Sequence, residues 1–450
     1  MTDSGKTIAA YRGRKVLVLG LARSGRAAMR LLADAGADAL GADEKGGIDG
    51  IEGAVRLGPF TGDLLDGREE VILSPGIPMA HGIVRLAHDR GIPVTSELSF
   101  GARFVEAPIV AVTGTNGKST TVSMAGAILE AAGIPAVVAG NVGTPLSAVA
   151  RSIDPSGVCV VEVSSFQLEA VADFRPRASG ILNMTPDHLD RYPDEESYYE
   201  AKQGIAANAR EEDLFFFNAD DERCRRAADR FPGARIPFSG GRLLDEGVFL
   251  DGDSIVRAGA AGREEIMNRG ELGVVGLHNV ENALAAIAAL SWLAVPGESI
   301  RHALAAFRGL PHRMERVAER GGVVWFNDSK ATNVEAAVKS LEGLDRPVVL
   351  IAGGHDKGGD FTKLLQVRDR LVAVVTIGEA APMIEEALAG RVPVAHAGVM
   401  RRAVETADRT ATAGQLVVLS PACASFDQFE NFEHRGEVFR ACVEALEDRG

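Results

Sequence analysis

Short apolar runs, each followed by a glycine-bearing or polar loop, recur along the whole chain. The first, residues 15–20 (KVLVLG), leads into a helical pattern that continues to Ala35 and that Gly36 ends. Other runs with the character of buried strands lie at residues 39–42, 71–77 (a strand running into a turn), 109–112, 158–163, 181–184, 214–218, 323–326, 347–352, 372–377 and 416–419. Because helical patterns separate many of them, we predict an α/β fold with mostly parallel sheets, whose ligands bind at the carboxyl ends of the strands.

Two interruptions of this pattern suggest domain boundaries. Pro93 and the polar residues 95–97 indicate a linker, and residues 308–311 (RGLP) indicate a second boundary. The longer helical patterns cover residues 121–131, the residues after Asp194, and residues 276–293. We therefore predict three domains, at residues 1–97, 98–309 and 310–450.

Composition narrows the class of protein. A chain of 450 residues is too long for one core, and its 46% hydrophobic and 24% charged residues are ordinary for a globular protein. The net charge of −14 argues against a general nucleic-acid or membrane-surface binder. The N-terminal residues lack the apolar core of a signal peptide and no apolar run approaches 18 residues, so we expect a cytoplasmic protein; we also expect a monomer. The scattered cysteines, which form no CxxC pair, are expected to be reduced thiols: Cys159, Cys224, Cys423 and Cys442.

The stretch at residues 110–121 (VAVTGTNGKSTT) carries the clearest chemistry. A strand, a glycine-bearing loop and a helix surround phosphate oxygens with backbone N–H groups. Lys118 would place a positive charge on the outer phosphates, and Ser119 would offer a hydroxyl to Mg²⁺. The first glycine, Gly114, comes only four positions before Lys118, so the loop is shorter than GxxxxGK[ST]. Phosphate binding is favoured over a plain turn.

The first βα turn is a weaker candidate for a nucleotide site. Gly20 and Gly25 fit the dinucleotide fingerprint GxGxxG, but Ala22 stands at its middle glycine. Asp43 lies near the position of a ribose-binding acid. A nucleotide or nucleotide-sugar site and a simple tight turn are equally favoured, whereas a dehydrogenase is disfavoured by Ala22 and by the separate phosphate loop.

Further polar residues sit at strand ends or on helical stripes. Glu162 ends an apolar strand and is expected to reach Mg²⁺ near the phosphate loop. The loop at residues 185–192 places His188 among acids. Lys202 lies on the apolar stripe of its helix. Its charged end either reaches solvent by snorkelling, which is the favoured interpretation, or sits inside a charged site. Residues Asn279 and Asn282 would either cap their helix or bind a base or phosphate.

Taken together, the motifs resemble the Mur ligase family, over nearly the whole chain. They are TGTNGKST, EVSSFQLE, NMTPDHLDRY, YYEAK, GLHNVENALAA, LPHRMERV, NDSKATN, GGHDKGGDF and SPACASFDQFENFEHRG. The short phosphate loop is that family's own form. The motifs are most similar to those of the members that add D-glutamate to UDP-N-acetylmuramoyl-L-alanine. Folylpolyglutamate synthetases share the loop but are not expected to carry NDSKATN or the SPACASFDQF tail, and the DNPR-type motif of the diaminopimelate- or lysine-adding members is absent.

The resemblance implies a fold and a set of site residues. The three domains would be Rossmann-like, P-loop ATPase-like with a mostly parallel sheet, and Rossmann-like. Residues for ATP would be Gly114, Thr115, Asn116, Gly117, Lys118, Ser119, Thr120, Asn279, Asn282, Arg313 and Asp328. Residues for the UDP-substrate would be Arg23, Ser24, Asp43, Glu44, Lys45, Ser74, Pro75, Gly76, Ile77, Asn141 and Ser164. D-glutamate would contact Thr332, Lys357, Ser425 and Phe432.

The resemblance also implies the chemistry. Lys118, His188 and Lys202 would be catalytic, with Lys202 carbamylated, and the metal ligands would be Ser119, Glu162, His188 and the Lys202 carbamate. The reaction would be an ATP-dependent amide ligation through an acyl phosphate, in peptidoglycan precursor synthesis, with two Mg²⁺ ions that Mn²⁺ could replace. The alternatives are another ligase of the Mur or folylpolyglutamate type, or a nucleotide-binding module without turnover.

Overall fold

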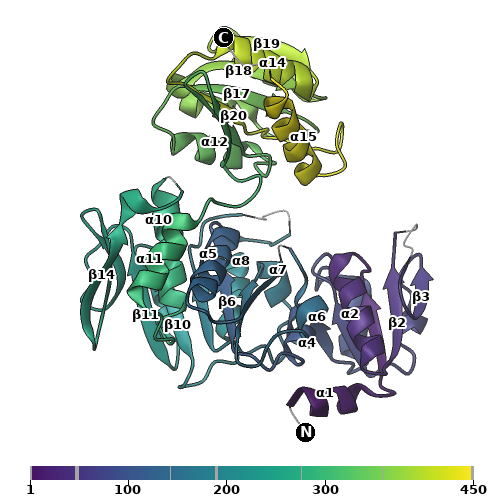
Figure 1. Cartoon of the computed structure of the whole chain (residues 1–450). Coiled ribbons are helices and arrows are strands. Elements are labelled where there is room, and N and C mark those ends of the chain that lie inside the picture. Colours follow the sequence, from purple (N-terminus) through teal and green to yellow (C-terminus); the bar gives the residue numbers. More distant parts are fainter. Residues whose placement is uncertain are drawn as a thin grey trace. The chain divides into compact units, whose positions relative to one another are not determined.

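The computed structural model describes residues 3–45, 50–141, 143–187, 191–274, 276–356 and 358–446. These residues form three β-sheets flanked by helices (Figure 1). The chain divides into two compact units: Met1–Leu272 with His278–Phe307, and Gly273–Leu277 with Arg308–Gly450. The N-terminal and central sheets both lie in the first unit, and the C-terminal sheet lies in the second. The predicted α/β fold with three sheet domains is confirmed, whereas the exact limits at residues 97 and 309 stay predictions.

The N-terminal sheet is entirely parallel. In spatial order its strands are β3 (Ala54–Leu57), β2 (Asp38–Asp43), β1 (Lys15–Leu19), β4 (Glu70–Leu73) and β5 (Val94–Ser96). Its helices are α1 (Asp3–Tyr11), α2 (Arg23–Asp34), the 3-10 helix η1 (Gly62–Leu65), α3 (Gly82–Asp89) and α4 (Glu97–Ala102). Because β1 lies between β2 and β4, the loops that follow these three strands share one edge.

The central sheet is parallel except in the strand pairings at one end. In spatial order its strands are β14 (Gly262–Asn268), β13 (Ser254–Gly259), β12 (Gly247–Asp251), β11 (Ala234–Ser239), β10 (Leu214–Asn218), β9 (Ala178–Ile181), β6 (Ile109–Thr113), β8 (Val158–Glu162) and β7 (Ala136–Gly140). Among the described strands of this sheet, β13 pairs antiparallel with both β12 and β14. Its helices are α5 (Lys118–Ala131), α6 (Leu146–Val149), α7 (Ser165–Leu168), α8 (Glu195–Gln203), η2 (Gly204–Ala206), α9 (Glu222–Asp229), η3 (Arg269–Glu271), α10 (Leu277–Ala289) and α11 (Gly297–Ala306).

The C-terminal sheet is parallel apart from its first strand. In spatial order its strands are β15 (Glu315–Arg320), β16 (Val323–Asn327), β20 (Leu416–Leu419), β17 (Val348–Gly353), β18 (Leu371–Ile377) and β19 (Val394–Gly398). Its helices are α12 (Val334–Glu342), η4 (Phe361–Arg370), α13 (Ala381–Leu388), α14 (Met400–Thr410) and α15 (Phe432–Glu444). The carboxyl ends of β16, β20 and β17 are neighbours.

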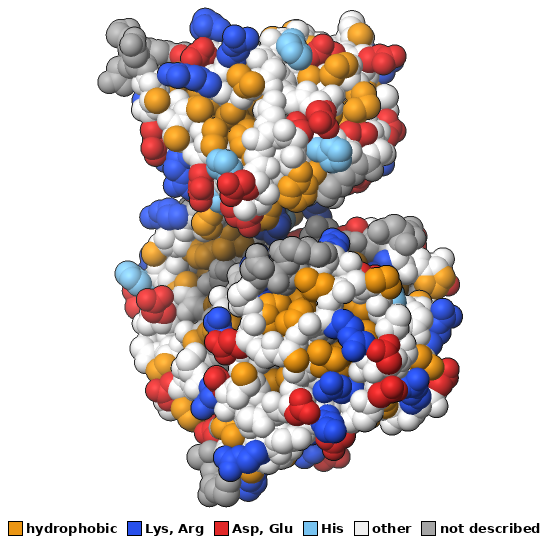
Figure 2. All heavy atoms as spheres, turned by 90° about the vertical axis from the view of Figure 1, so that its right-hand side faces the viewer, with side chains coloured by type: hydrophobic (Ala, Val, Ile, Leu, Met, Phe, Trp, Pro, Cys, Tyr) orange, Lys and Arg blue, Asp and Glu red, His pale blue; other side chains and the backbone are white. Residues whose placement is uncertain are grey.

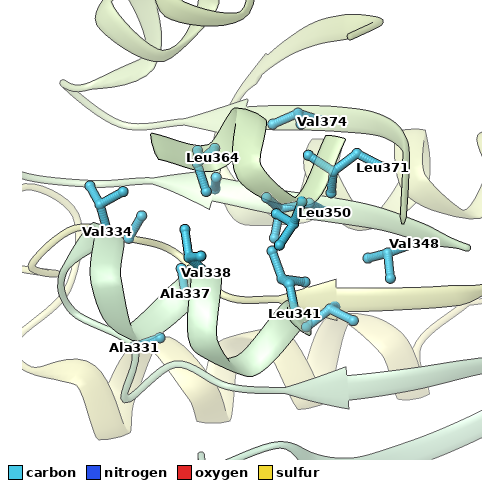
Figure 3. Close-up of a cluster of buried hydrophobic side chains, with 14 of the residues drawn as sticks. Ala331, Val334, Ala337, Val338, Leu341, Val348, Leu350, Leu364, Leu371 and Val374 are labelled. Carbon is cyan, nitrogen blue, oxygen red and sulfur yellow. The ribbon is translucent and has the colours of Figure 1, made fainter. Parts of the chain in front are cut away.

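The central strand β17 shows why the C-terminal domain needs helices on both faces. Alternate side chains of a strand point to opposite faces, and here every residue is apolar or glycine and buried. Val348 and Leu350 belong to the cluster that α12 and η4 cover, and Figure 3 shows Val338 and Leu341 of α12 on the same side as Leu350. Val349 belongs to the cluster on the other face.

Three local predictions were wrong. The polar residues 95–97, predicted as a linker, form β5 and the first residue of α4, because the Thr95 hydroxyl donates to the buried Glu70 carboxylate at 3.0 Å. The strand predicted at residues 181–184 lies at β9, and the helix predicted to reach residue 293 ends with α10 at Ala289. The strand predicted to run into a turn within residues 71–77 is confirmed, because β4 ends at Leu73 and the N–H of Ile77 donates to the Ser74 carbonyl at 3.0 Å, whereas β3 was not predicted.

Acidic and basic side chains are interspersed on the face that Figure 2 shows, so the negative net charge is not gathered in one patch there. A search of the described residues finds no helix with both the length and the apolar character that crossing a membrane requires. All four cysteines are free, and three of them are buried.

Candidate active site

The phosphate loop has the predicted strand, turn and helix. β6 ends at Thr113, and α5 begins at Lys118 directly after Gly117. Gly114 has φ +148° and Gly117 has φ +87°, which are backbone conformations that glycine adopts far more readily than other residues. A side chain at Gly117 would also collide with the Asn282 amide. The spacing of the two glycines is therefore a requirement of the loop's shape.

The segment after β9 holds this loop in place. The backbone N–H of Asn116 donates to Asn183 Oδ1 at 2.8 Å, and the N–H of Thr115 donates to the Asn183 carbonyl at 3.1 Å. The Thr115 hydroxyl donates to the Thr185 carbonyl at 3.0 Å. Three chain-distant bonds thus fix the loop, which keeps its backbone N–H groups oriented as an anion site requires.

Two lysine ammonium groups meet at the loop. Lys118 Nζ donates to the carbonyls of Gly114 and Thr115, at 2.8 and 2.9 Å. Lys202 Nζ, on α8, donates to the same Gly114 carbonyl at 2.9 Å and lies 4.4 Å from the centroid of the Tyr198 ring. The Lys202 side chain is 1% exposed. The favoured prediction that Lys202 snorkels to solvent is therefore wrong, because its ammonium group lies inside the protein.

Burial changes the acidity of this amine. Desolvation, together with the positive charge of Lys118, lowers the pKa of Lys202 from 10.5 to about 7. A substantial fraction of Lys202 is therefore neutral near pH 7, and a neutral amine is the form that reacts with carbon dioxide to give a carbamate.

Glu162 ends β8 beside the phosphate loop, in register with Val112 of β6. The residue is 1% exposed, and Asn141 Nδ2 donates to its Oε1 at 3.0 Å. Its Oε2 is buried and has no hydrogen-bond partner among the described residues. A buried carboxylate oxygen left in this way is costly, and a bound cation would compensate it, so Glu162 suits a hard divalent ion.

The described residues do not complete a metal site. No group of three or more His, Cys, Asp or Glu side chains among them could hold a metal. The predicted ligand His188 and the predicted D-glutamate residue Lys357 lie outside the described residues. Ser119, the predicted hydroxyl ligand, is buried in the first turn of α5.

The predicted UDP-substrate residues gather at the carboxyl edge of the N-terminal sheet. Ser74 Oγ donates to the Gly20 carbonyl at 2.6 Å, which joins the turns after β4 and β1. The Asp43 carboxylate accepts the backbone N–H groups of Leu21 and Lys45, at 2.6 and 2.8 Å. Asp43 therefore has a clear structural role in the tight turn.

The remaining residues of this set lie on the same edge or on the central domain. Arg23 and Ser24 begin α2, and Arg23 Nη1 donates to the Gly143 carbonyl at 2.6 Å. Glu44 lies 3.7 Å from the His81 ring, whereas Pro75 and Gly76 follow Ser74 in the turn. Ser164 accepts the N–H of Gln167 as the N-cap of α7.

Asn279 and Asn282 face the phosphate loop from α10. Asn282 Oδ1 lies 3.4 Å from the Thr121 hydroxyl on α5, and its Nδ2 donates to Asn279 Oδ1 at 3.3 Å. Asn282 is 7% exposed. The pair thus connects the two helices beside the loop, which goes beyond capping its own helix.

Within the C-terminal domain, the predicted residues lie at the carboxyl ends of β16 and β20. The Asp328 carboxylate accepts the N–H of Met314 at 3.2 Å and the hydroxyl of Ser420 at 2.8 Å. Burial raises the pKa of Asp328 from 3.8 to about 6. Arg313 stands in the turn between two residues with positive φ, His312 and Met314. The predicted D-glutamate residues Thr332, Ser425 and Phe432 follow β16 and β20 or begin α15.

Two arginines with several hydrogen bonds to site segments, one in each compact unit, were not predicted. Arg435 is fully buried and donates to the Ser329 hydroxyl and to the carbonyls of Ser329, Cys423 and Ala424, at 2.8–3.1 Å. It shares a stripe of α15 with Phe439 and Val443, as Lys202 shares one on α8, so the same signal could have found it. Arg191, whose contacts lie far away in sequence, left no such signal.

Comparison with known proteins identifies the family. The model of the MurD-like N-terminal domain of Mur ligases matches residues 14–96, that of the Mur ligase middle domain matches residues 112–290, and that of the glutamate ligase domain of Mur ligases matches residues 312–423. A UDP-N-acetylmuramoylalanine–D-glutamate ligase of Salinibacter ruber is 43% identical over 97% of this chain and 98% of the relative. The chain belongs to the Mur ligase family.

Other Mur ligases agree with this assignment. A ligase of the same name from Syntrophotalea carbinolica is 41% identical over 98% of this chain and all of the relative. Among solved structures, the UDP-N-acetylmuramate-alanine ligase MurC of Thermotoga maritima covers 96% of this chain and all of its own, with TM-score 0.61 and 19% identity. The MurF ligase of the same organism, in complex with ADP, covers 97% and 96%, with TM-score 0.61 and 15% identity. These structures support the fold.

Proposed function

We propose that this chain is the Mur ligase that joins D-glutamate to UDP-N-acetylmuramoyl-L-alanine, with ATP as co-substrate, in peptidoglycan precursor synthesis. The observation that carries the proposal is the identity of 41–43% over almost the full length with ligases of that name. The short phosphate loop, with Glu162 and Lys202 beside it, supports the ATP-dependent chemistry.

The reaction must first activate a carboxylate, because a carboxylate is a poor electrophile. An oxygen of the alanyl carboxylate attacks the γ-phosphorus of ATP, the bond to the β-phosphate oxygen breaks, and ADP leaves. The amine of D-glutamate then attacks the acyl carbon, phosphate departs with the electrons of the carbon–oxygen bond, and the nitrogen loses a proton. An amide remains. Phosphoryl transfer of this kind depends mainly on positioning and on charge stabilisation.

The residues of the chain supply both. Residues 114–120 would surround the ATP phosphates, and Lys118 would add a positive charge there. Ser119, Glu162, His188 and a carbamate on Lys202 would hold two Mg²⁺ ions, which neutralise phosphate charge when bound. The unpartnered Glu162 Oε2 and the low pKa of the Lys202 amine support this assignment.

The substrate assignments follow the sheet edges. The turns after β1, β2 and β4 would bind the uridine diphosphate, with Asn141 and Ser164 nearer the sugar. Arg313 and Asp328, together with Asn279 and Asn282, would contact ATP. Thr332, Lys357, Ser425 and Phe432 would position D-glutamate. The monomeric state and the cytoplasmic location remain predictions, and light scattering on the purified chain tests the first.

One assay tests the function. The chain is incubated with ATP, Mg²⁺ and UDP-N-acetylmuramoyl-L-alanine while only the amino acid is varied, and phosphate release is followed. We expect release with D-glutamate and little with L-glutamate or with diaminopimelate. Phosphate release that does not depend on the UDP-substrate or on the amino acid would contradict the proposal.

A further inference from the structure

Arg191 connects α7 and the turn at Pro75, two segments with residues that the proposed function assigns to the UDP-substrate. It lies in the first compact unit with all its partners. Its guanidinium binds the Glu169 carboxylate through two parallel hydrogen bonds, Nε to Oε1 at 3.0 Å and Nη2 to Oε2 at 2.7 Å. Its Nη1 donates to the Pro75 carbonyl at 2.9 Å. Pro75 is 116 residues away in the chain and lies in the predicted UDP-substrate turn.

Glu169 lies directly after α7, the short helix that Ser164 caps. On the same helix, the Phe166 ring lies 4.0 Å from the guanidinium carbon of Arg191. The ion pair is well shielded, since both side chains are 13% exposed. A shielded, bidentate pair stacked on an aromatic ring holds its geometry far better than an exposed one. Arg191 therefore fixes α7 and the turn at Pro75 to each other.

A row of aromatic rings continues from this point to the phosphate loop. The rings of Phe166 and Tyr192 lie 6.1 Å apart, and those of Tyr192 and Tyr198 lie 5.3 Å apart. The Tyr198 hydroxyl donates to the Thr115 hydroxyl at 3.4 Å, and its ring contacts the Lys202 ammonium group. Packed rings transmit position because a close-packed interior resists deformation. The backbone carbonyl of Pro75 is thus linked to the phosphate loop through the side chain of Arg191 and this row of rings.

We propose that Arg191 is a positioning residue that sets the place of the UDP-substrate turn relative to the phosphate loop. The inference rests on the proposed function. The alanyl carboxylate at one end of the UDP-substrate must lie in line with the γ-phosphorus of ATP, while the uridine end is held in the N-terminal domain. An error of about 1 Å in such an arrangement lowers the rate by about a hundredfold. Arg191 acts through the backbone of Pro75 and through α7, and it touches no reacting atom in this assignment.

A lysine cannot replace this arginine. The guanidinium donates three N–H groups, all in one plane, to the Glu169 carboxylate and to the Pro75 carbonyl. The single nitrogen of a lysine cannot reach both of these groups while it lies on the Phe166 ring. Arg191→Lys therefore keeps the charge and removes the fork. Arg175→Lys is the matched control, because Arg175 binds Asp213 through Nε and Nη2 at 2.8 and 3.1 Å and contacts none of the assigned substrate residues.

The test compares steady-state kinetics of the full chain with each substitution. For Arg191→Lys we expect kcat to fall about tenfold or more and KM for the UDP-substrate to rise, with KM for ATP within about twofold of the starting value, because Asn183 and Thr185 still hold the phosphate loop. Arg175→Lys should leave all three constants within about twofold. Thermal unfolding of both variants accompanies the kinetics.

Two results would overturn the inference. One is unchanged kinetics in Arg191→Lys. The other is a parallel worsening of every constant with a fall in unfolding temperature, which indicates a merely structural arginine. If the unsubstituted chain showed no D-glutamate-dependent turnover, the proposed function would fail by itself. Calorimetric binding of UDP-N-acetylmuramoyl-L-alanine would then test the inference about Arg191. Weaker binding in Arg191→Lys than in the Arg175→Lys control supports the positioning role, and equal binding contradicts it.

Discussion

At the scale of single residues, burial makes Lys202 unlike the lysines of the surface. Its pKa of about 7 lies well below the ordinary 10.5, so between these values the unfolded chain binds a proton that the folded chain does not. The free energy of unfolding therefore rises with pH across this window. Lys202→Met should flatten this part of the dependence, and urea unfolding at several pH values measures it. If the substitution leaves the slope of the free energy of unfolding against pH unchanged, the burial of the Lys202 amine is contradicted.

The same residue carries a prediction about activity. Lys202→Ala is expected to lower turnover by about a hundredfold or more, because the carbamate oxygens would be lost from the metal site. Acetate or formate added to this variant should restore part of the rate by replacing those oxygens. Lys363→Ala, which removes an exposed lysine paired with Glu335, is the control. Near-normal turnover of Lys202→Ala in plain buffer would show that Lys202 only packs in the interior and takes no part in the reaction.

Glu162 allows a test of metal binding that does not depend on the lysine. Glu162→Gln keeps the shape of the side chain but removes its charge, so the Mg²⁺ concentration for half-maximal rate should rise about tenfold or more. Its stability without metal should stay equal or increase, because a buried charge is gone. Glu97→Gln is a close control, since Glu97 is also buried with an unpartnered Oε2, yet lies on α4. A Mg²⁺ dependence that changes equally in both variants would contradict the assignment.

At the scale of elements, α15 ties together the loops that follow β16 and β20. Burial lowers the pKa of Arg435 from 12.5 to about 10, and its donors satisfy three backbone carbonyls. Arg435→Lys would leave some of these carbonyls without partners, which is expected to lower the free energy of unfolding by about 2–4 kcal/mol. KM for D-glutamate should rise with it, because Ser425 lies in one of these loops.

The control for this prediction lies on the same helix. Arg440 pairs with Glu315 and its side chain is 40% exposed, so Arg440→Lys should change stability by less than about 1 kcal/mol. Urea unfolding of both variants makes the comparison. Equal effects of the two substitutions would show that Arg435 has no special part in holding the loops.

The burial of each strand explains which elements could be predicted from the sequence. Central strands such as β17 and β6 are continuous apolar runs and were found, whereas the edge strands β3 and β5 were not. All four residues of β3 are exposed, so no buried face forces a pattern on it. In β5, Thr95 and Ser96 are buried through their hydroxyl groups, with Thr95 bonded to Glu70 and Ser96 capping α4. A polar sequence thus concealed a buried strand.

The candidate site, too, has a part that could be predicted from the sequence and a part that could not. The phosphate loop could be predicted because its function needs particular residue types at fixed spacing within one segment. The partners of Lys202 and Arg191 could not, because Gly114 and Pro75 meet them only after folding brings distant segments together. Here the resemblance to a family supplied roles that periodicity alone did not.

At the scale of the whole molecule, the residues assigned to ATP are divided between the two compact units. The phosphate loop lies in the first, and Arg313 and Asp328 lie in the second. The raised pKa of Asp328 means that, between pH 3.8 and about 6, the folded chain binds a proton that the unfolded chain lacks. Stability contributed by this group is therefore lost as pH rises through about 6.

Asp328→Asn should separate stability from function. At pH 7.5 we expect the variant to be as stable as the original chain or more so, while KM for ATP rises about tenfold, as after the loss of a hydrogen bond to a charged group. Calorimetry and kinetics on the same samples test both halves. A variant that loses stability and ATP affinity together would show Asp328 to be a structural residue.

The bond from Arg191 to the carbonyl of Pro75 has a consequence for how this family changes over time. Every residue type carries a backbone carbonyl, so substitutions at position 75 leave this acceptor in place, whereas Glu169 supplies the acceptors of the ion pair with its side chain. Among related sequences, changes at position 191 should therefore be correlated with changes at position 169 and uncorrelated with those at position 75. The residue types of the turn can therefore change during evolution while the hydrogen bond from Arg191 to the carbonyl at position 75 persists. Only an insertion or deletion in the turn would break this bond.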